Sequence, residues 1–134
     1  MVNMNRILLA EDNDDLRELI TDFLSEHGFD VYAAVDGEDA WEAVQTTRYQ
    51  LVLLDVMMPG LDGIRTTLKV RETSSIPIII LSAKSEDADK ILGLNIGADD
   101  YITKPFNPIE VSARVKSQLR RYMQLGGKSE AKRS

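Results

Sequence analysis

The sequence predicts an α/β fold in which short strands alternate with helices. Apolar runs of strand length recur along the chain, and longer amphipathic segments separate them. Most of these runs are apolar on both faces, which is typical of strands that helices cover on both sides. Strands that alternate with helices build a parallel sheet. Five such units match the flavodoxin-like (βα)5 doubly wound parallel sheet, with strand order 2-1-3-4-5.

Each predicted strand has a core of two to four residues, and most of these residues are aliphatic. They are Ile7-Leu8-Leu9-Ala10, Val31-Tyr32-Ala33-Ala34, Leu51-Val52-Leu53-Leu54, Ile78-Ile79-Ile80-Leu81 and Tyr101-Ile102.

The first helix is predicted from apolar residues that recur with helical spacing on one face. These residues are Leu16, Leu19, Ile20, Phe23 and Leu24, which follow the i, i+3, i+4, i+7, i+8 pattern. Asp36 precedes a second amphipathic segment and is expected to cap its N-terminus.

Three further helices complete the alternation. One is expected from about Gly63 to Glu72, with Ile64, Leu68 and Thr67 facing inward. Another is expected over residues 86–96. The last begins near Pro108, because proline is tolerated at the first position of a helix.

Length and composition favour a single domain. The chain has 134 residues, 43% hydrophobic, and a net charge of -6, so we expect one core and no direct binding of nucleic acid. Residues 4–124 form the predicted domain, and the polar residues 125–134 are expected to be a linker or a disordered tail. The sequence contains no cysteine, no signal peptide and no apolar run that could span a bilayer, so a cytoplasmic location is expected.

Polar residues gather at the carboxyl ends of the predicted strands. Glu11 and Asp12 follow the first strand, Asp55 follows the third, Ser82 the fourth, and Lys104 the fifth. In a parallel sheet these ends share one edge. Three clustered carboxylates repel each other unless a cation joins them, and oxygen ligands without Cys or His favour Mg²⁺. With an ammonium and a hydroxyl beside a carboxylate nucleophile, the set fits phosphoryl transfer.

Each residue also has a simpler explanation when taken alone. Acidic residues such as Glu11 and Asp12 favour helix N-termini, and Asp55 could belong to a turn. Ser82 and Lys104 could be ordinary strand-end residues, and Tyr101 could serve packing only. Taken together, the five polar residues that follow the strands favour phosphoryl transfer over these separate explanations.

Four segments carry a resemblance to a known family. They are Leu8-Leu9-Ala10-Glu11-Asp12-Asn13, Leu53-Leu54-Asp55-Val56-Met57-Met58-Pro59-Gly60, Leu81-Ser82-Ala83 and Gly97-Ala98-Asp99-Asp100-Tyr101-Ile102-Thr103-Lys104-Pro105-Phe106. In order and spacing they resemble the motifs of response regulator receiver domains of two-component systems. The resemblance extends over about residues 4 to 124.

The resemblance implies a role for each residue of the acidic cluster. Asp55 would be the phosphoacceptor, and Asp12 a direct Mg²⁺ ligand. Glu11, where many receivers have aspartate, would help to hold the ion through water. The backbone carbonyl of Met57 would be a further ligand, and its side chain would tune dephosphorylation. Lys104 would pair with the phosphoryl group.

The resemblance also implies a switch and a phosphodonor. Ser82 would move to the phosphoryl group, and Tyr101 would rotate into the space that Ser82 leaves. A sensor histidine kinase would present phosphohistidine, and acetyl phosphate could replace it. The phosphorylated receiver would then shift between two conformations.

The stretch from Lys90 to Arg121 resembles the OmpR/PhoB subfamily, whose receivers dimerise and carry a DNA-binding domain. That subfamily implies intermolecular ion pairs between Lys90 and Glu110, Asp100 and Arg114, and Asp99 and Arg121. The alternative is a solvated charged face that contributes little. The chain is then either part of a longer transcription regulator or a free-standing receiver that acts through protein contacts.

Other functions fit the residues less well. A phosphatase with an aspartyl nucleophile usually needs a second acid two residues later, where this chain has Met57, so the chain is not expected to be an enzyme. A constitutive interaction module would need a disrupted acidic cluster. A flavin or dinucleotide binder would need a glycine-rich first turn, where this chain has Glu11-Asp12-Asn13.

Overall fold

The five strands form one parallel sheet in the order that the sequence predicts. The computed structural model describes residues 5–58, 62–83, 95 and 97–123. The strands are β1 (Arg6–Ala10), β2 (Asp30–Ala34), β3 (Leu51–Asp55), β4 (Ile78–Ala83) and β5 (Asp100–Lys104), and they lie in the order β2-β1-β3-β4-β5. This confirms the flavodoxin-like prediction, and the switch in strand order falls between β1 and β3.

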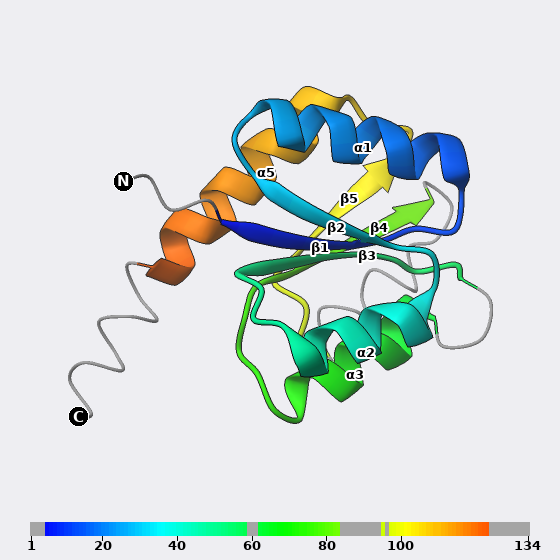
Figure 1. Ribbon diagram of the computed structural model, residues 1–134, viewed down its shortest axis with the longest axis vertical. Coiled ribbons are helices and arrows are strands. Elements are labelled where there is room, and N and C mark those ends of the chain that lie inside the picture. The colour runs from blue at the N-terminus through cyan, green and yellow to red at the C-terminus, as the bar shows by residue number, and fades with distance from the viewer. Residues whose placement is uncertain (1–4, 59–61, 84–94, 96, 124–134) are drawn as a thin grey trace.

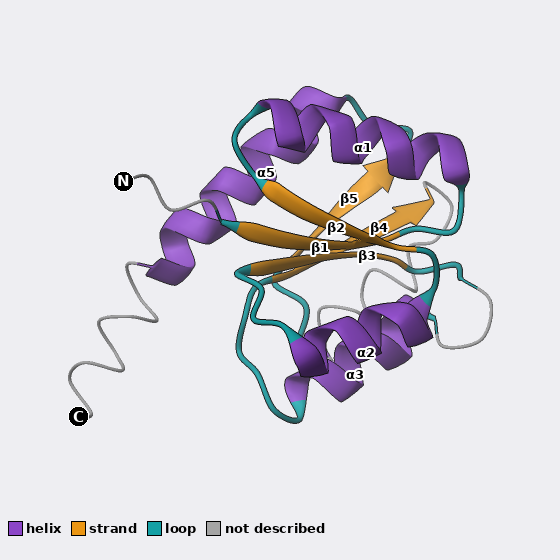
Figure 2. Ribbon diagram, in the orientation of Figure 1, coloured by secondary structure: helices purple, strands orange, loops and turns teal. Residues whose placement is uncertain are grey.

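Helices cover both faces of the sheet. The helices are α1 (Asp14–Glu26), α2 (Gly37–Thr46), α3 (Gly63–Arg71) and α5 (Pro108–Arg121). Figure 1 shows α1 and α5 on one face and α2 and α3 on the other, and Figure 2 shows the resulting three layers. The helix predicted over residues 86–96 falls almost entirely outside the described residues. Within the described part of the chain, no helix is long and apolar enough to cross a membrane.

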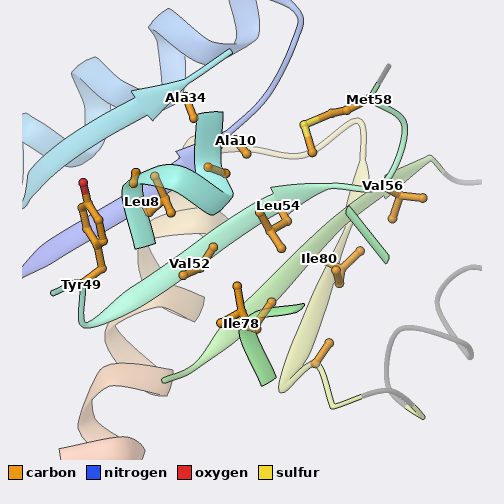
Figure 3. Packing of buried hydrophobic residues seen from close by; sticks show 14 residues of the cluster. Leu8, Ala10, Ala34, Tyr49, Val52, Leu54, Val56, Met58, Ile78 and Ile80 are labelled. Atoms are coloured by element: carbon orange, nitrogen blue, oxygen red, sulfur yellow. The ribbon is translucent and has the colours of Figure 1, made fainter. Parts of the chain in front are cut away.

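Alternate strand residues feed two separate hydrophobic clusters. In β3, Val52 and Leu54 face the α2–α3 layer, whereas Leu51 and Leu53 face the α1–α5 layer. Figure 3 shows the first cluster, in which Leu8, Ile78 and Ile80 meet the β3 side chains. All five residues of β3 are buried. Apolar burial contributes about 25 cal/mol per Å², and this central strand contributes buried side chains to both hydrophobic clusters.

Local sequence signals place the helix starts as predicted. The Asp36 side chain accepts a hydrogen bond from the Asp39 N–H at 2.8 Å, and Pro108 occupies the first turn of α5. Two inward-facing predictions are wrong. Leu19 is 49% exposed and Leu68 is 47% exposed.

The error has a packing cause. Helix α3 buries Thr66, Thr67 and Val70 instead of Leu68. The Thr66 and Thr67 hydroxyls donate to the carbonyls of Asp62 and Gly63, at 2.7 and 2.8 Å. Such bonds inside the helix satisfy the hydroxyls, so threonine can occupy a buried face that hydrophobicity alone assigns to leucine.

Candidate functional site

The polar strand ends meet at one edge of the sheet. Asp55 is the last residue of β3 and lies beside Leu81 in the β3–β4 register. Lys104 is the last residue of β5 and pairs with Ala83. Glu11 and Asp12 directly follow β1, which neighbours β3. The sheet therefore brings together residues that are far apart in the sequence.

Three carboxylates form a compact cluster at this edge. Oxygen atoms of Glu11, Asp12 and Asp55 all lie within 4.8 Å of one another. Asp55 is 3% exposed and Glu11 is fully buried, while Asp12 is exposed. The cluster therefore has an open side at Asp12 and a closed side at Glu11.

One ammonium balances part of this negative charge. Lys104 Nζ lies 3.2 Å from Asp55 Oδ1 and 3.3 Å from Glu11 Oε1. Despite the short distance to Lys104 Nζ, Glu11 Oε1 has no hydrogen bond with good geometry among the described residues. The contact is therefore an ion pair that leaves acceptor capacity on Glu11 unused.

Crowding changes the protonation of Glu11. Burial of the carboxyl group and, next in size, the adjacent Asp55 carboxylate together raise the pKa of Glu11 to about 7. The Asn13 N–H, which donates to Glu11 Oε2 at 3.1 Å, and Lys104 act in the opposite direction. A buried carboxylate beside a second carboxylate is stabilised by a bound cation, as expected for the interaction of charges in a poorly solvated site.

The donor set fits a hard divalent cation. Among the described residues, the cluster offers oxygen atoms only, and the buried Glu11 Oε1 lacks a hydrogen-bond partner. Mg²⁺ uses one or two carboxylates with water and substrate oxygens, so an exposed Asp12 suits its needs. The N–H of Met57 donates to Asp55 Oδ1 at 3.3 Å, which fixes the turn after β3 close to the cluster. The Met57 side chain is 61% exposed.

A hydroxyl without a partner lies beside the cluster. Ser82 is fully buried, and its Oγ has no hydrogen-bond partner in the described residues. Because leaving a buried hydroxyl unsatisfied costs on the order of 1–3 kcal/mol, such a group is more typical of a functional site than of a plain strand end. Tyr101 is half-buried and packs against the cluster that α2 and α3 cover.

Two supporting residues were missed by the sequence interpretation. Gly63 starts α3 against the end of β3, and an added Cβ would overlap the backbone carbonyl of Asp55. The only sequence signal was the glycine itself. Arg17 donates from Nη1 to the backbone carbonyl of Glu11 at 2.8 Å. An arginine three residues after Asp14 suggests only a helical ion pair.

The predicted dimer residues that the structure describes lie at the amino ends of the strands, which is the edge opposite the acidic cluster, and on the surface of α5. Arg114 Nη1 lies 2.8 Å from Asp100 Oδ1 of the same chain, and Nη2 lies 3.5 Å from Glu110. Arg121 is exposed at the end of α5. Lys90 lies outside the described residues.

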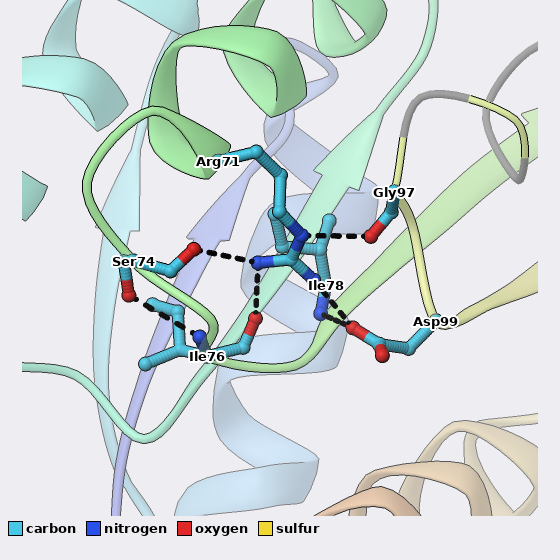
Figure 4. Close-up of polar contacts among 6 residues, drawn as sticks. All are labelled: Arg71, Ser74, Ile76, Ile78, Gly97 and Asp99. Atoms are coloured by element: carbon cyan, nitrogen blue, oxygen red, sulfur yellow. Dashed lines mark hydrogen bonds and ion pairs between the residues drawn. The ribbon is translucent and has the colours of Figure 1, made fainter.

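Asp99 is engaged by a residue that the sequence interpretation did not consider. Arg71 Nη2 lies 2.7 Å from Asp99 Oδ2, which also accepts the Ile78 N–H at 2.8 Å. Arg71 further donates to the carbonyls of Gly97, Ser74 and Ile76 at 2.8, 3.2 and 2.7 Å (Figure 4). We call this set of contacts the Arg71 hub. The intermolecular pairing of Asp99 with Arg121 stays a prediction.

The family follows from comparison with known proteins. Residues 7–116 match the family described as the response regulator receiver domain. This chain belongs to the response regulator receiver family. As a receiver domain, it is the signal-receiving part of a two-component response regulator.

Relatives and solved structures agree with this assignment. The regulatory protein VanRc of Enterococcus gallinarum is 47% identical over 117 residues, which is 87% of this chain and 51% of that protein. The transcriptional regulatory protein CpxR homolog of Haemophilus influenzae is 47% identical over 118 residues, 88% of this chain and 52% of that protein. The chain thus spans about half the length of these relatives.

The fold is likewise that of a solved receiver. The receiver domain of the Francisella response regulator 1452 superposes with a TM-score of 0.82 and 37% identity, over 87% of this chain and 98% of that one.

Proposed function

We propose that this receiver, taken as residues 4–124, accepts a phosphoryl group on Asp55 in a Mg²⁺-dependent reaction. The observation that carries the proposal is the buried Asp55 with two carboxylates within 4.8 Å and the Lys104 ammonium at 3.2 Å. An Asp55 carboxylate oxygen attacks phosphorus of a phosphohistidine on a sensor histidine kinase. The bond from phosphorus to the imidazole nitrogen breaks, that nitrogen becomes free to take up a proton, and an acyl phosphate forms.

The surrounding side chains have separate roles in this reaction. Glu11, Asp12, Asp55 and the Met57 carbonyl hold Mg²⁺, which neutralises charge on the phosphoryl oxygens when it is bound. Lys104 pairs with one phosphoryl oxygen, and the Ser82 hydroxyl donates to another. Transfer of a phosphoryl group to Asp55 therefore supplies the acceptor that the buried Ser82 lacks.

The same change provides a signal. Movement of Ser82 toward the phosphoryl group vacates space beside Tyr101, which rotates inward. Tyr101 belongs to β5, whose end also carries Lys104. The conformations of β5 and α5 then shift in population. Water later attacks phosphorus, the acyl phosphate hydrolyses, and inorganic phosphate leaves. We expect no sustained turnover, because Met57 stands where a phosphatase needs a general acid.

The decisive experiment is intact mass spectrometry after incubation with acetyl phosphate and Mg²⁺. The wild-type protein should gain the mass of one phosphoryl group, and neither Asp55→Asn nor the EDTA-treated protein should gain it. Asp22→Asn, which changes an exposed aspartate on α1, is the matched control and should be phosphorylated like wild type. A wild-type protein that stays unmodified after rapid acid quenching would favour a constitutive interaction module.

We further propose that phosphorylation promotes a homodimer through β5 and α5. The surface carries Asp99, Asp100, Glu110, Arg114 and Arg121, and Lys90 would complete it. Asp100 and Arg114 already pair within one chain at 2.8 Å, so dimerisation would exchange a partner instead of creating a new pair. That exchange would set register and specificity more than affinity.

Light scattering of the phosphorylated protein tests the dimer. Arg121→Glu should remain monomeric while its phosphorylation stays normal, and Arg48→Glu is the control. A longer protein of this kind would regulate transcription through a DNA-binding domain, as the CpxR homolog is named a transcriptional regulatory protein. A receiver that stays monomeric when phosphorylated would favour the alternative, a free-standing receiver that acts by contacts with other proteins.

A further inference from the structure

The turn that carries Glu11 and Asp12 is held by one guanidinium group. Arg17 lies in α1, and its side chain is only 18% exposed. Its Nη1 donates to the backbone carbonyl of Glu11 at 2.8 Å. Its Nη2 pairs with the carboxylate of Asp14, which fixes the other side of the guanidinium plane.

The backbone on both sides of Asp12 is anchored as well. The Glu11 N–H donates to the Ala34 carbonyl at 3.3 Å, on the neighbouring strand β2. The Asn13 side chain accepts the Leu16 N–H at 2.9 Å and so caps α1. The Arg17 contact to the Glu11 carbonyl is a second side-chain bond that ties this turn to α1, and it acts on the other side of Asp12 from Asn13.

Asp12 itself has no comparable support. Its side chain is exposed, and no hydrogen bond or ion pair of its carboxylate is found among the described residues. The position of the Asp12 carboxylate is therefore set mainly by the backbone of the turn, which the Arg17 guanidinium holds at Glu11.

We propose that Arg17 is a positioning residue for the divalent cation. It orders the Glu11–Asp12 turn before the ion arrives, so that less conformational freedom is lost on binding. Arg17 contacts no reacting atom and is therefore not a catalytic residue. This inference rests on the proposed Mg²⁺-dependent phosphorylation of Asp55.

The charge of Arg17 alone predicts the opposite effect, and this gives the proposal a clear test. A cation near a cation site weakens metal binding by repulsion. Removal of the charge should then strengthen Mg²⁺ binding if only electrostatics matters. If positioning dominates, removal of the guanidinium should weaken it.

The measurement is the Mg²⁺ dissociation constant by titration calorimetry, together with the rise in melting temperature that Mg²⁺ produces. Arg17→Met and Arg17→Lys should both raise the dissociation constant by about tenfold, the size seen when groups that orient metal ligands are removed. Arg17→Lys retains the charge but cannot bridge both acceptors with a planar fork. The control Arg48→Met removes an exposed arginine outside this turn and should bind like wild type.

Phosphorylation by acetyl phosphate gives a second readout. The Mg²⁺ concentration for half-maximal rate should rise in both Arg17 variants, while the rate at saturating Mg²⁺ stays within about twofold of wild type because the ion restores the turn. A purely structural role would lower the melting temperature without moving this concentration. Asp14→Asn, which loosens the anchor of Arg17, should shift it in the same direction by less.

The outcomes separate the two proposals. Wild-type protein that binds Mg²⁺ while Arg17→Met and Arg17→Lys bind equally or more tightly would overturn the positioning role alone. If Arg17→Met does not fold, Arg17→Lys and Asp14→Asn decide the question. Wild-type protein that binds no Mg²⁺ would overturn the proposed function and this inference with it.

Discussion

The two edges of the sheet treat polar and charged groups in opposite ways. At the carboxyl edge, three carboxylates cluster while the Lys104 ammonium pairs with only two of them, Glu11 and Asp55, and the atoms Glu11 Oε1 and Ser82 Oγ have no hydrogen-bond partner in the described structure. At the opposite edge, the Arg71 guanidinium donates to three carbonyls and to the Asp99 carboxylate. In the described structure, the carboxyl edge therefore keeps polar atoms without hydrogen-bond partners, whereas at the opposite edge the Arg71 guanidinium uses most of its N–H donors.

The difference separates a binding site from a structural joint. Unsatisfied polar groups raise the free energy of the folded protein, so they persist where a ligand completes them. The Arg71 hub connects the end of α3, the segment before β4 and the turn before β5 (Figure 4). It needs no ligand, and it fixes the edge of the sheet farthest from the acidic cluster.

Loss of the Arg71 hub should give the largest effect on stability. Arg71→Met leaves three part-buried carbonyls without their donor, so the free energy of unfolding should fall by about 4 kcal/mol. Loss of the pair with the exposed Asp99 carboxylate adds little to this. Urea denaturation measures this change. Arg65→Met, at an exposed position of the same helix, is the control and should change stability by less than about 0.5 kcal/mol. Equal effects of the two variants would contradict a structural role for the hub.

Two glycines test how rigid each edge is. A Cβ at Gly63 would overlap the Asp55 carbonyl, whereas a Cβ at Gly97 would meet the Arg71 side chain at 3.1 Å. The backbone of β3 cannot move aside for an added methyl group as easily as the flexible Arg71 side chain can. Gly63→Ala should therefore cost about 3 kcal/mol, and Gly97→Ala, strained by its φ of +112°, about 1–2 kcal/mol.

The same pair should differ in chemistry. Gly63→Ala should also slow phosphorylation by acetyl phosphate, because it displaces the end of β3. Gly97→Ala should phosphorylate at the wild-type rate in time-resolved mass spectrometry. A slow Gly97→Ala variant would mean that the two edges are coupled.

Removal of a charge at the acidic edge should stabilise the protein instead. Asp55→Asn relieves carboxylate repulsion, so the protein in EDTA at pH 8 should gain about 1 kcal/mol of stability. With Mg²⁺ added, wild type should instead be more stable than Asp55→Asn, since wild type binds the ion more tightly. Melting temperatures with and without Mg²⁺ measure both signs. An Asp55→Asn protein that is less stable than wild type in EDTA would show that the cluster is not under electrostatic stress.

A pH dependence of the metal-free protein is also expected. The pKa of Glu11 is raised from 4.5 to about 7, so the folded state holds a proton that the unfolded state has lost between these values. This contribution to stability is fully present below about pH 4.5 and is lost as the pH rises through about 7. Melting temperatures of wild type relative to Glu11→Gln in EDTA should therefore fall from pH 5 to pH 8. A constant difference would contradict the raised pKa.

Much of the fold could be read from short apolar runs. The runs at Ile7, Leu51 and Ile78 predicted strands, because strands covered on both faces are apolar on both faces. Helix faces were less certain. Leu19 and Leu68 followed the helical period but are exposed, since the period alone does not say where the neighbouring layer ends.

The carboxyl-edge cluster was predictable for a topological reason. Parallel strands place their carboxyl ends together, so Asp55, Glu11 and Lys104 were expected to meet without any knowledge of side-chain positions. No such rule covers the opposite edge. Arg71 and Asp99 are 28 residues apart, and nothing in the spacing pairs them. Subfamily resemblance instead suggested Arg121 of another copy as the partner of Asp99.

The sequence by itself indicated the strands and the residues at their carboxyl ends, because periodicity and strand ends are local properties. The strand order followed from the match to a known topology, and the phosphoacceptor candidate followed from the family resemblance. Only the tertiary structure decided how the charges are satisfied. It placed Lys104 between Asp55 and Glu11, Arg17 on the Glu11 carbonyl and Arg71 on Asp99. Long side chains choose partners among whatever the fold brings within reach, and that choice depends on distances that a linear pattern does not contain.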